Sequence, residues 1–355
     1  MNIGEDIVWI DIPHPKYAWE FRKLLELLEK KNFKTLITAR DGLGILEICK
    51  LLKYSNITVV GKYGKSIEEK LIYDIERMRE FYNILRRLNS KVIACIGVDS
   101  ASLRVAYGLK IRTVCVNDTP KNVKLCRLTI SISDYLITPR CCVENFKKLY
   151  NLKFTKVIDY DGIEERSYIT PELVDIKLHY AKRRDRINIV LRDVEYLSSY
   201  AISSKVDIVK IIEIIKRSFD NVSILLLARY EEDYGKYIDI KRKFDREVDI
   251  IVPRRSLLLP IYLTCVDLVI GSGGTICRES TLLGIPTISF YFWDEQMRYL
   301  NKLGFPNMYS RPSQLLENIS KIVKDLDRYC VDTRSMLTRM ESPLEYIVEI
   351  ICKLL

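Results

Sequence analysis

The sequence predicts an α/β protein built from two doubly wound, Rossmann-like domains, and three observations support this. Its 355 residues are too many for one ordinary hydrophobic core. Short apolar runs alternate with amphipathic helical patterns, which is typical of βαβ units and a parallel sheet. The polar and basic segment Pro171–Arg186 interrupts this alternation, which then starts again. We therefore place the domain junction in that segment.

The first predicted domain covers residues 1–175. Its strands are expected at Ile7–Ile10, Thr35–Thr38, Ile57–Val60, Val92–Ile96, Arg112–Val116, Tyr135–Thr138 and Lys156–Ile158. A long helix begins after Ser66, which pairs with Glu69 in a capping box. The following apolar side chains share one face of this helix: Ile67, Leu71, Ile75, Met78 and Leu85.

The second predicted domain covers residues 186–340, and a last helix occupies 341–355. Its strands are expected at Ile187–Leu191, Val222–Ala228, Asp249–Val252, Asp267–Ile270 and Thr287–Tyr291. The last helix is marked by the cap Ser342, by Pro343 at its first position and by Glu345, which completes a capping box. Ligands of open parallel sheets bind beyond the carboxyl ends of the strands, so we expect the site in a cleft between the two sheets.

Composition excludes several classes of protein. The net charge of +10 favours anionic partners, or it reflects solvated helix faces in a lysine-rich chain. No aromatic-studded RNA platform or zinc finger is present in the sequence, so we expect no nucleic-acid partner. The 10 cysteines form no C-x-x-C pair and only His14 and His179 could add imidazoles, so we expect no metal and no cofactor.

The sequence also indicates where the protein works. Met1–Trp9 lacks the basic and apolar regions of a signal peptide. The most apolar stretch, Leu257–Ile270, is shorter than the ~20 residues of a membrane span and contains Pro260 and Asp267. We expect a cytoplasmic protein, peripheral at a membrane surface if its acceptor is a lipid.

The strongest local motif follows a buried strand of the second domain, where Gly271, Ser272, Gly273, Gly274 and Thr275 lead into a helix. Glycines let backbone N–H groups approach an anion, and a helix N-terminus favours negative charge. The turn is therefore a candidate phosphate site, the alternative being a tight turn without a ligand.

Three more polar side chains of the second domain are candidates for substrate binding. Glu279 follows one helical turn after the glycines, where it can accept hydrogen bonds from ribose hydroxyls or lie on a solvated helix face. Arg192 ends the first strand of this domain and is a candidate anion clamp. Arg254, in Pro253-Arg254-Arg255, follows another strand and can meet a base or a phosphate, or lie in a surface loop.

The first domain offers four candidates for acid–base chemistry. Asp11 and His14 follow its first strand, and His14 is either a general base or a loop residue between two prolines. Asp99 and Asp118 each follow a central strand, as carboxylates for acid–base work in a cleft would. Asp99 also fits a helix cap.

These motifs together resemble a largely archaeal family of unknown function, DUF354. The resemblance covers nearly the whole chain and rests on Trp9-Ile-Asp-Ile, Leu36-Ile-Thr-Ala-Arg-Asp, Arg104-Val-Ala-Tyr-Gly-Leu, Asn117-Asp-Thr, Asp161-Gly-Ile-Glu-Glu, Val252-Pro-Arg and Val269-Ile-Gly-Ser-Gly-Gly-Thr-Ile-Cys-Arg-Glu-Ser-Thr-Leu-Leu-Gly-Ile-Pro. The family is similar to two groups with the GT-B fold. One is the N-acetylglucosaminyltransferase that completes the lipid-linked peptidoglycan precursor, and the other is the non-hydrolysing UDP-N-acetylglucosamine 2-epimerases.

The resemblance implies a GT-B fold whose C-terminal helix crosses back to the first, acceptor-side domain. It also implies that Ser272, Gly273 and Gly274 hold a diphosphate and Glu279 a ribose. The chain departs from the family where histidines are expected: Tyr17 and Trp19 follow the first strand, and Ile96 stands in the fourth. The donor half thus matches better than the catalytic half.

Three functions follow as hypotheses. The first is a metal-independent glycosyltransferase that takes a nucleotide-diphosphate sugar, most readily a UDP-sugar, to an acceptor such as a lipid phosphate at a membrane surface. The second is a nucleotide-sugar epimerase with Asp99 and Asp118 as its acid and base. The third is a sugar-nucleotide-binding protein without catalysis. The oligomeric state is not predicted.

Overall fold

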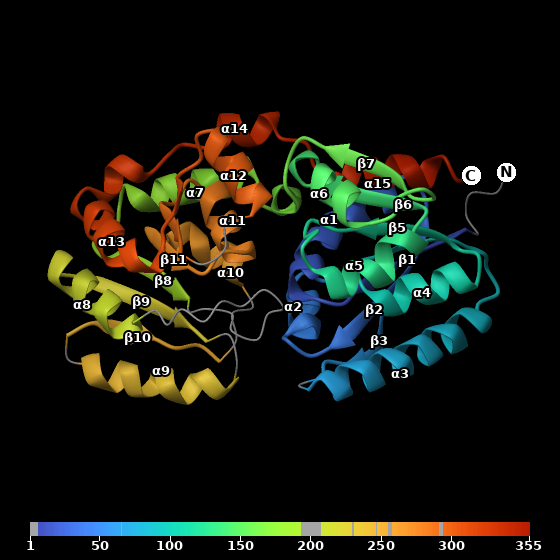
Figure 1. Cartoon of the computed structure of the whole chain (residues 1–355), viewed down its shortest axis with the longest axis horizontal. Coiled ribbons are helices and arrows are strands. Elements are labelled where there is room, and N and C mark those ends of the chain that lie inside the picture. The colour runs from blue at the N-terminus through green and yellow to red at the C-terminus, as the bar shows by residue number, and fades with distance from the viewer. Residues whose placement is uncertain are drawn as a thin grey trace. The chain divides into compact units, whose positions relative to one another are not determined.

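The computed structural model describes residues 6–64, 66–192, 207–228, 231–245, 247–254, 258–290 and 294–355. The chain divides into a first unit, Met1–Tyr168 with Glu341–Leu355, and a second unit, Ile169–Met340. Each unit holds a parallel sheet between layers of helices (Figure 1). The predicted α/β fold with two doubly wound sheets is confirmed.

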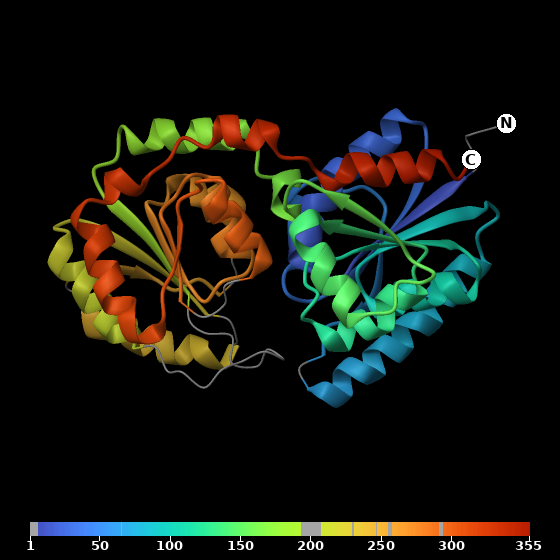
Figure 2. The same cartoon turned by 45° about the horizontal axis from the view of Figure 1, so that its top comes forward.

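The first unit has a seven-stranded sheet in the order β3-β2-β1-β4-β5-β6-β7. The strands are β1 Ile7–Ile12, β2 Lys34–Asp41, β3 Ile57–Lys62, β4 Val92–Gly97, β5 Arg112–Val116, β6 Tyr135–Pro139 and β7 Lys156–Tyr160. The helices are α1 Pro15–Lys30, α2 Ile45–Leu51, α3 Ile67–Arg86, α4 Ser100–Gly108, α5 Val123–Thr129, α6 Val143–Leu149 and α15 Pro343–Cys352, with a 3-10 turn η4 at Glu164–Ser167. Helices α1 and α15 cover one face of the sheet, and α3 and α4 cover the other (Figure 2).

Side chains of β1 alternate between the two faces of this sheet. Trp9 packs edge-on against Phe81 of α3, with 4.9 Å between ring centroids, and its indole N–H donates to Thr38 at 2.9 Å. A buried tryptophan needs such a partner for its N–H. Asp11 is two residues further along β1, so it points to the same α3 side.

The second unit has a six-stranded sheet in the order β10-β9-β8-β11-β12-β13. The strands are β8 Ile187–Arg192, β9 Val222–Leu227, β10 Asp249–Ile251, β11 Leu268–Gly271, β12 Thr287–Ser289 and β13 Asn307–Tyr309. The helices are α7 Pro171–Ala181, α8 Ile208–Ser218, α9 Glu231–Phe244, α10 Leu259–Tyr262, α11 Thr275–Leu282, α12 Glu295–Lys302, α13 Leu315–Lys324 and α14 Arg334–Arg339.

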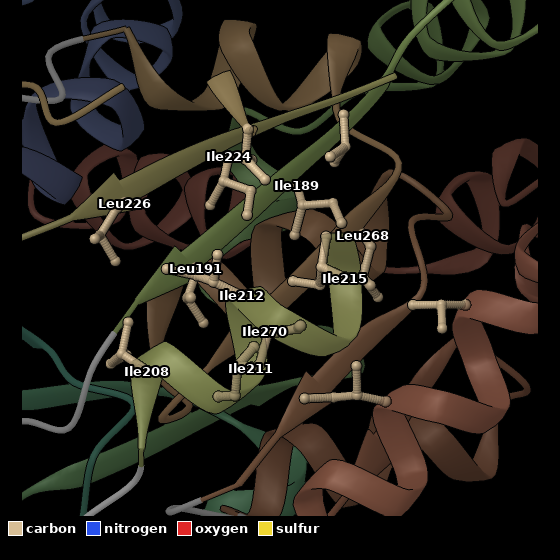
Figure 3. Packing of buried hydrophobic residues seen from close by; sticks show 14 of the residues in the cluster. Ile189, Leu191, Ile208, Ile211, Ile212, Ile215, Ile224, Leu226, Leu268 and Ile270 are labelled. Carbon is tan, nitrogen blue, oxygen red and sulfur yellow. The ribbon is translucent and has the colours of Figure 1, made fainter. Parts of the chain in front are cut away.

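Helix α8 shows how this second core forms. Its isoleucines at 208, 211, 212 and 215 follow the spacing of one helix face, and all four are buried. They lie against Ile189, Leu191 and Ile270 from the central strands (Figure 3). Because both faces of a parallel sheet are covered, its strands read as continuous apolar runs rather than as alternating patterns.

The segment over which we placed the domain junction, 171–186, contains helix α7. The chain passes from the first unit to the second between Tyr168 and Ile169, so α7 belongs to the second unit. It buries Lys177, whose ammonium lies 3.1 Å from a carboxylate oxygen of Asp267. Asp267 is distant from Lys177 in the sequence. The sequence pattern alone therefore could not show that the polar segment 171–186 forms a helix with a buried lysine.

The C-terminal helix α15 packs on α1, β6 and η4 of the first unit, as the predicted crossing requires. Its cap Ser342 accepts a hydrogen bond from the N–H of Leu344 at 3.2 Å, and no capping box with Glu345 is seen at this described helix start. Just before it, the N–H of Glu341 donates to the carbonyl of Asp161 at 2.9 Å. A Cβ at position 162 would come within 2.2 Å of the Glu341 carbonyl oxygen, so the close approach requires glycine.

The predicted apolar face of α3 is only half buried. The capping box of Ser66 and Glu69 is present. Met78 and Leu85 pack against the core around Trp9 and Phe81, but Ile67, Leu71 and Ile75 are exposed. The reason is that the buried face holds Arg77, whose charged partners lie under the helix. The first half of α3 therefore presents large apolar side chains outwards.

Candidate functional site

The glycine turn of the second unit has the backbone that an anion site needs. β11 ends at Gly271, and α11 begins at Thr275. Gly273 and Gly274 have φ angles of 105° and 77°, which favour glycine over any residue with a side chain. A Cβ on Gly274 would meet no described atom within 4 Å, so this part of the turn is open. The first amide groups of α11 therefore lie beside an accessible turn.

Glu279 lies in the same helix and is only 4 % exposed. This burial excludes the alternative that Glu279 lies on a solvated helix face. Its neighbour Arg278 is also buried, and its guanidinium lies 2.8 Å from Asp294. Asp294 caps α12 by accepting from the N–H of Met297 at 2.7 Å. The Arg278–Asp294 ion pair thus connects α11 to the start of α12. The sequence pattern did not predict this pair.

The two arginines predicted for this site lie at different distances from the turn. β8 pairs directly with β11, so Arg192 at the end of β8 is beside Gly271, and its Cβ is 4.0 Å from where a Cβ on Gly271 would be. Arg254 follows the edge strand β10 and lies over the ring of Tyr234, with 5.5 Å to its centroid. Three strand spacings separate β10 from β11, about 14 Å. The structure therefore brings Arg192 to the turn but not Arg254.

In the first unit, two of the predicted carboxylates belong to one buried ion-pair network. Arg77 is fully buried and binds Asp11 at 2.9 Å and Asp99 at 2.7 Å. Asp11 also accepts from the hydroxyl of Thr38 at 2.8 Å. Arg40 adds a second cation, 3.5 Å from Asp99. We call these residues the Arg77 network.

The network sets the charge of its carboxylates. Burial raises the pKa of Asp99, but the charges of Arg77 and Arg40 outweigh this and leave that pKa below its usual value. Burial also raises the pKa of Asp11, and the Arg77 charge only partly offsets the increase. Asp99 occupies the N-cap position of α4, yet its side chain makes no cap hydrogen bond. Both carboxylates hold Arg77 in this conformation.

The other face of the same sheet carries a second buried cluster around Lys16, which is in the first turn of α1. Its ammonium lies 2.8 Å from Asp118, 2.5 Å from Glu164 and 3.2 Å from Glu165. Asp118 follows β5, and the two glutamates begin η4 after β7, so all three come from carboxyl ends of strands. We call this group, with Glu20 of α1, the Lys16 cluster.

The Lys16 cluster contains more carboxylates than its one lysine balances. Burial lowers the pKa of Lys16, but Asp118, Glu164 and Glu165 outweigh this and raise it. Burial and the charge of Asp118 raise the pKa of Glu164 to about 8. Glu20 is fully buried, and neither of its oxygens has a hydrogen-bond partner among the described residues. Burial together with the charge of Glu164 raises its pKa well above the usual value. The cluster therefore favours the protonated form of Glu164 at neutral pH.

His14 and the residues at the expected histidine positions lie near this cluster. His14 is exposed, and its ring accepts a hydrogen bond from the N–H of Lys16 at 3.4 Å. The Tyr17 hydroxyl donates to Glu164 at 3.5 Å, and Trp19 packs against Tyr168 with 6.4 Å between ring centroids. Ile96 is a core residue of β4. Tyr17 is the one of these three with a polar group in the cluster.

The partners of both clusters were absent from our list of candidates. Glu164 and Glu165 are part of Asp161-Gly-Ile-Glu-Glu, one of the segments that resemble the family. That resemblance is the sequence feature that could have indicated a role for the two glutamates. No sequence feature indicated a role for Lys16 or Arg77, because a lysine or arginine in an amphipathic helix normally lies in solvent.

Among the residues that the structure describes, no group of His, Cys, Asp and Glu could hold a metal ion. No described helix is long and apolar enough to cross a membrane.

Two doubly wound parallel sheets, a glycine turn at the carboxyl end of β11 and a last helix returning to the first unit define a protein of the GT-B fold. The chain belongs to the family described as protein of unknown function (DUF354), which matches residues 6–355. It is 28% identical over 359 residues to an uncharacterised protein of Methanocaldococcus jannaschii, covering 98% of each chain.

Solved structures share this fold at low identity. A UDP-GlcNAc 2-epimerase from Neisseria meningitidis bound to UDP-GlcNAc has a TM-score of 0.68 at 15% identity, with 98% of this chain and 100% of that one covered. The Methanocaldococcus jannaschii UDP-GlcNAc 2-epimerase in complex with UDP-GlcNAc and UDP has 0.67 at 15%, with 98% and 99% covered. Acinetobacter baumannii MurG has 0.50 at 12%, with 98% and 99% covered.

Proposed function

We propose that this chain binds a nucleotide-diphosphate sugar on the glycine turn of its second unit and transfers the sugar to an acceptor. The observation that carries the proposal is the open turn at Gly273 and Gly274, at the N-terminus of α11 and beside Arg192. Backbone N–H groups and the helix dipole favour an anion there. Structures of the same fold were solved with UDP-GlcNAc or UDP, which makes a UDP-sugar the first ligand to test.

Different residues of the second unit bind different groups of the ligand in this proposal. Ser272, Gly273, Gly274 and Thr275 donate to the diphosphate, with Gly271 shaping the entry to the turn, and Arg192 is beside it to balance the charge. Glu279 accepts from the ribose hydroxyls. Arg254, which is further along the sheet edge, is left for the base or for a group beyond the phosphates. The Arg278–Asp294 pair positions α11 without touching the ligand.

Sugar transfer also needs a base for the acceptor hydroxyl. The base takes the hydroxyl proton while the oxygen attacks the anomeric carbon, and the bond from that carbon to the diphosphate breaks, so UDP leaves. Asp118 is the best candidate, because Lys16 holds it at the carboxyl end of β5. His14 is an exposed second candidate on the same sheet edge. Asp11 and Asp99 are engaged by Arg77, so we propose that they act indirectly, by fixing Arg77.

A second candidate function is epimerisation of a UDP-sugar. It is favoured by the fold shared with 2-epimerases. Asp118 after β5 is its candidate base, and Asp99 after β4 would have to leave its ion pair with Arg77 to serve as the acid. Non-catalytic binding is the third candidate, because Tyr17, Trp19 and Ile96 stand where the family's histidines are expected.

Ligand screening and product analysis separate these functions. Thermal unfolding with UDP-, GDP-, dTDP- and CMP-sugars should single out one nucleotide, and calorimetry should give its affinity. No stabilisation by any of them would remove the proposal. Incubation with the selected nucleotide sugar should then release UDP in the presence of a lipid-phosphate acceptor. A changed sugar without UDP release indicates epimerisation, and tight binding without any product indicates a binding protein.

A further inference from the structure

The exposed side of α3 carries a regular seam that the proposed function does not use. The residues Glu68, Ile72, Ile75, Arg79, Tyr82 and Arg86 follow each other at alternating steps of four and three, and all six are exposed. Such steps place side chains in one line along a helix, as in coiled-coil seams. Leu71 flanks the line. We call these six residues the outer seam of α3.

The first half of α3 exposes large apolar side chains in the outer seam and beside it. Ile72 and Ile75 are 51% and 55% exposed, and Leu71 and Ile67 beside them are more so. Single exposed apolar residues are ordinary, but a cluster of them with a polar rim marks an interaction surface. Helix α3 lies on the outer side of the first unit in both views (Figure 1, Figure 2).

The order of charges along the seam indicates its partner. The seam begins with an acidic residue, has two isoleucines next, and ends with Arg79, Tyr82 and Arg86. An antiparallel copy of the same helix, centred at position 77, would pair Glu68 with Arg86, Ile72 with Tyr82 and Ile75 with the aliphatic stem of Arg79. A parallel copy would instead place Glu68 on Glu68 and Arg86 on Arg86, which is destabilising. Arg86 already lies over the ring of Tyr82, with 5.5 Å to its centroid.

From this self-complementary sequence we infer that two copies of the chain associate through antiparallel α3 helices. Such a contact uses the same patch on both subunits, so it closes as a two-fold dimer. At about 1.5 Å per residue, the seam from Glu68 to Arg86 is about 27 Å long. An anionic lipid surface is the less favourable partner, because Glu68 and Glu76 at the apolar end would be repelled by it.

Sedimentation velocity on the full chain tests this inference across a concentration series. The wild type should be a dimer, and Ile72→Asp should be a monomer, because it places a charge in the seam opposite Tyr82. Leu128→Asp is the matched control, an exposed leucine on α5, and should leave the dimer intact. Circular dichroism should show the same folded content in all three. A monomeric wild type, or a dimeric Ile72→Asp variant, would overturn the inference.

A charge swap tests the antiparallel register. Glu68→Arg alone and Arg86→Glu alone should each weaken the dimer about tenfold or more, because each change affects two symmetry-related contacts. The double variant should restore the wild-type dissociation constant. Absence of this rescue would reject the register. Binding of monomeric wild type to phosphatidylglycerol vesicles, lost in Ile72→Asp, would replace the dimer by a lipid surface.

Discussion

The two units form their candidate sites, at the carboxyl ends of their strands, from different parts of the chain. In the second unit the candidate site is made of backbone, since two glycines with positive φ open the start of α11. In the first unit it is made of charged side chains from distant segments, such as Lys16 with Asp118 and Arg77 with Asp11. A site made of backbone groups is formed by consecutive residues, whereas a site made of side chains from distant segments forms only when the chain folds. The first kind can be predicted from one sequence, and the second cannot.

The difference also predicts how the two edges respond to substitution. Removing one partner of a buried ion pair strongly lowers the stability of the protein, because the other charge stays buried without its partner. A glycine turn contributes through space and backbone conformation, so changes there affect ligand binding more than the core. The variants below test this contrast from the largest expected effect to the smallest.

Arg77→Met should destabilise the protein by about 3–5 kcal/mol, because it removes the cation paired with buried Asp11 and leaves Asp99 with the more distant Arg40, at 3.5 Å. Chemical denaturation followed by circular dichroism measures this. Arg104→Met, at an exposed position of the neighbouring helix α4, is the matched control and should change stability by less than about 0.5 kcal/mol. The triple variant Asp11→Asn, Arg77→Met, Asp99→Asn should recover part of the loss. Equal stability of the two single variants would show that the network contributes nothing.

The sequence predicted the fold well because apolar runs and helix periodicity are local signals. Of the strands that the structure describes, all except β13 were predicted, and residue 291 of the Thr287–Tyr291 prediction lies outside the described residues. β13 has only Asn307, Met308 and Tyr309, too few residues for a periodic pattern. The apolar stripe of α3 was predicted in the same way, but periodicity shows only that a stripe exists and not what covers it.

The candidate site was predicted in part. Gly271–Thr275 were recognised because the glycines, the strand before them and the helix after them are contiguous. No local pattern pairs Arg77 with Asp11, or Lys16 with Glu164, since these contacts join segments far apart in the chain. The roles assigned to Asp11, His14, Asp99 and Asp118 stay predictions.

Gly273→Asp should weaken nucleotide-sugar binding at least about 100-fold, since it adds a negative charge where the diphosphate is proposed to bind. Gly273→Ala is the matched control, because it has the same unfavourable φ of 105° without the charge. We expect the alanine variant to lose much less affinity. Calorimetry with the nucleotide selected by screening measures both. Unchanged affinity in the aspartate variant would remove the diphosphate from this turn.

The Lys16 cluster should make stability depend on pH. The pKa of Glu164 is raised to about 8 in the folded protein, so the folded state holds a proton that the unfolded state releases near its lower, ordinary pKa. Stability should therefore fall as pH rises from about 4.5 to about 8, the interval between the two pKa values, by up to about 1.4 kcal/mol per pH unit. The groups facing Glu164 are Lys16, Asp118, Glu165, Glu20, Tyr17 and Tyr160.

Glu164→Gln should lose this part of the pH dependence, because an amide does not titrate. Glu29→Gln, an exposed position on α1, is the control and should keep the wild-type pH profile. Denaturation midpoints at several pH values give the comparison. A Glu164→Gln profile that parallels the wild type would mean that Glu164 is ionised throughout this range.

Glu279→Gln should have the smallest effect, a loss of about 1 kcal/mol in binding, or roughly fivefold to tenfold in affinity. The amide keeps the size of the buried side chain but replaces one acceptor oxygen by a donor. If Glu279 accepts from the 2′-hydroxyl of the ribose, the loss should appear with UDP and disappear with 2′-deoxy-UDP, which lacks that hydroxyl. Wild type should accordingly prefer UDP over 2′-deoxy-UDP, and Glu279→Gln should bind both alike. Calorimetry on this two-by-two set distinguishes a ribose contact from a purely structural role, because a side chain that only shapes α11 would weaken both ligands equally.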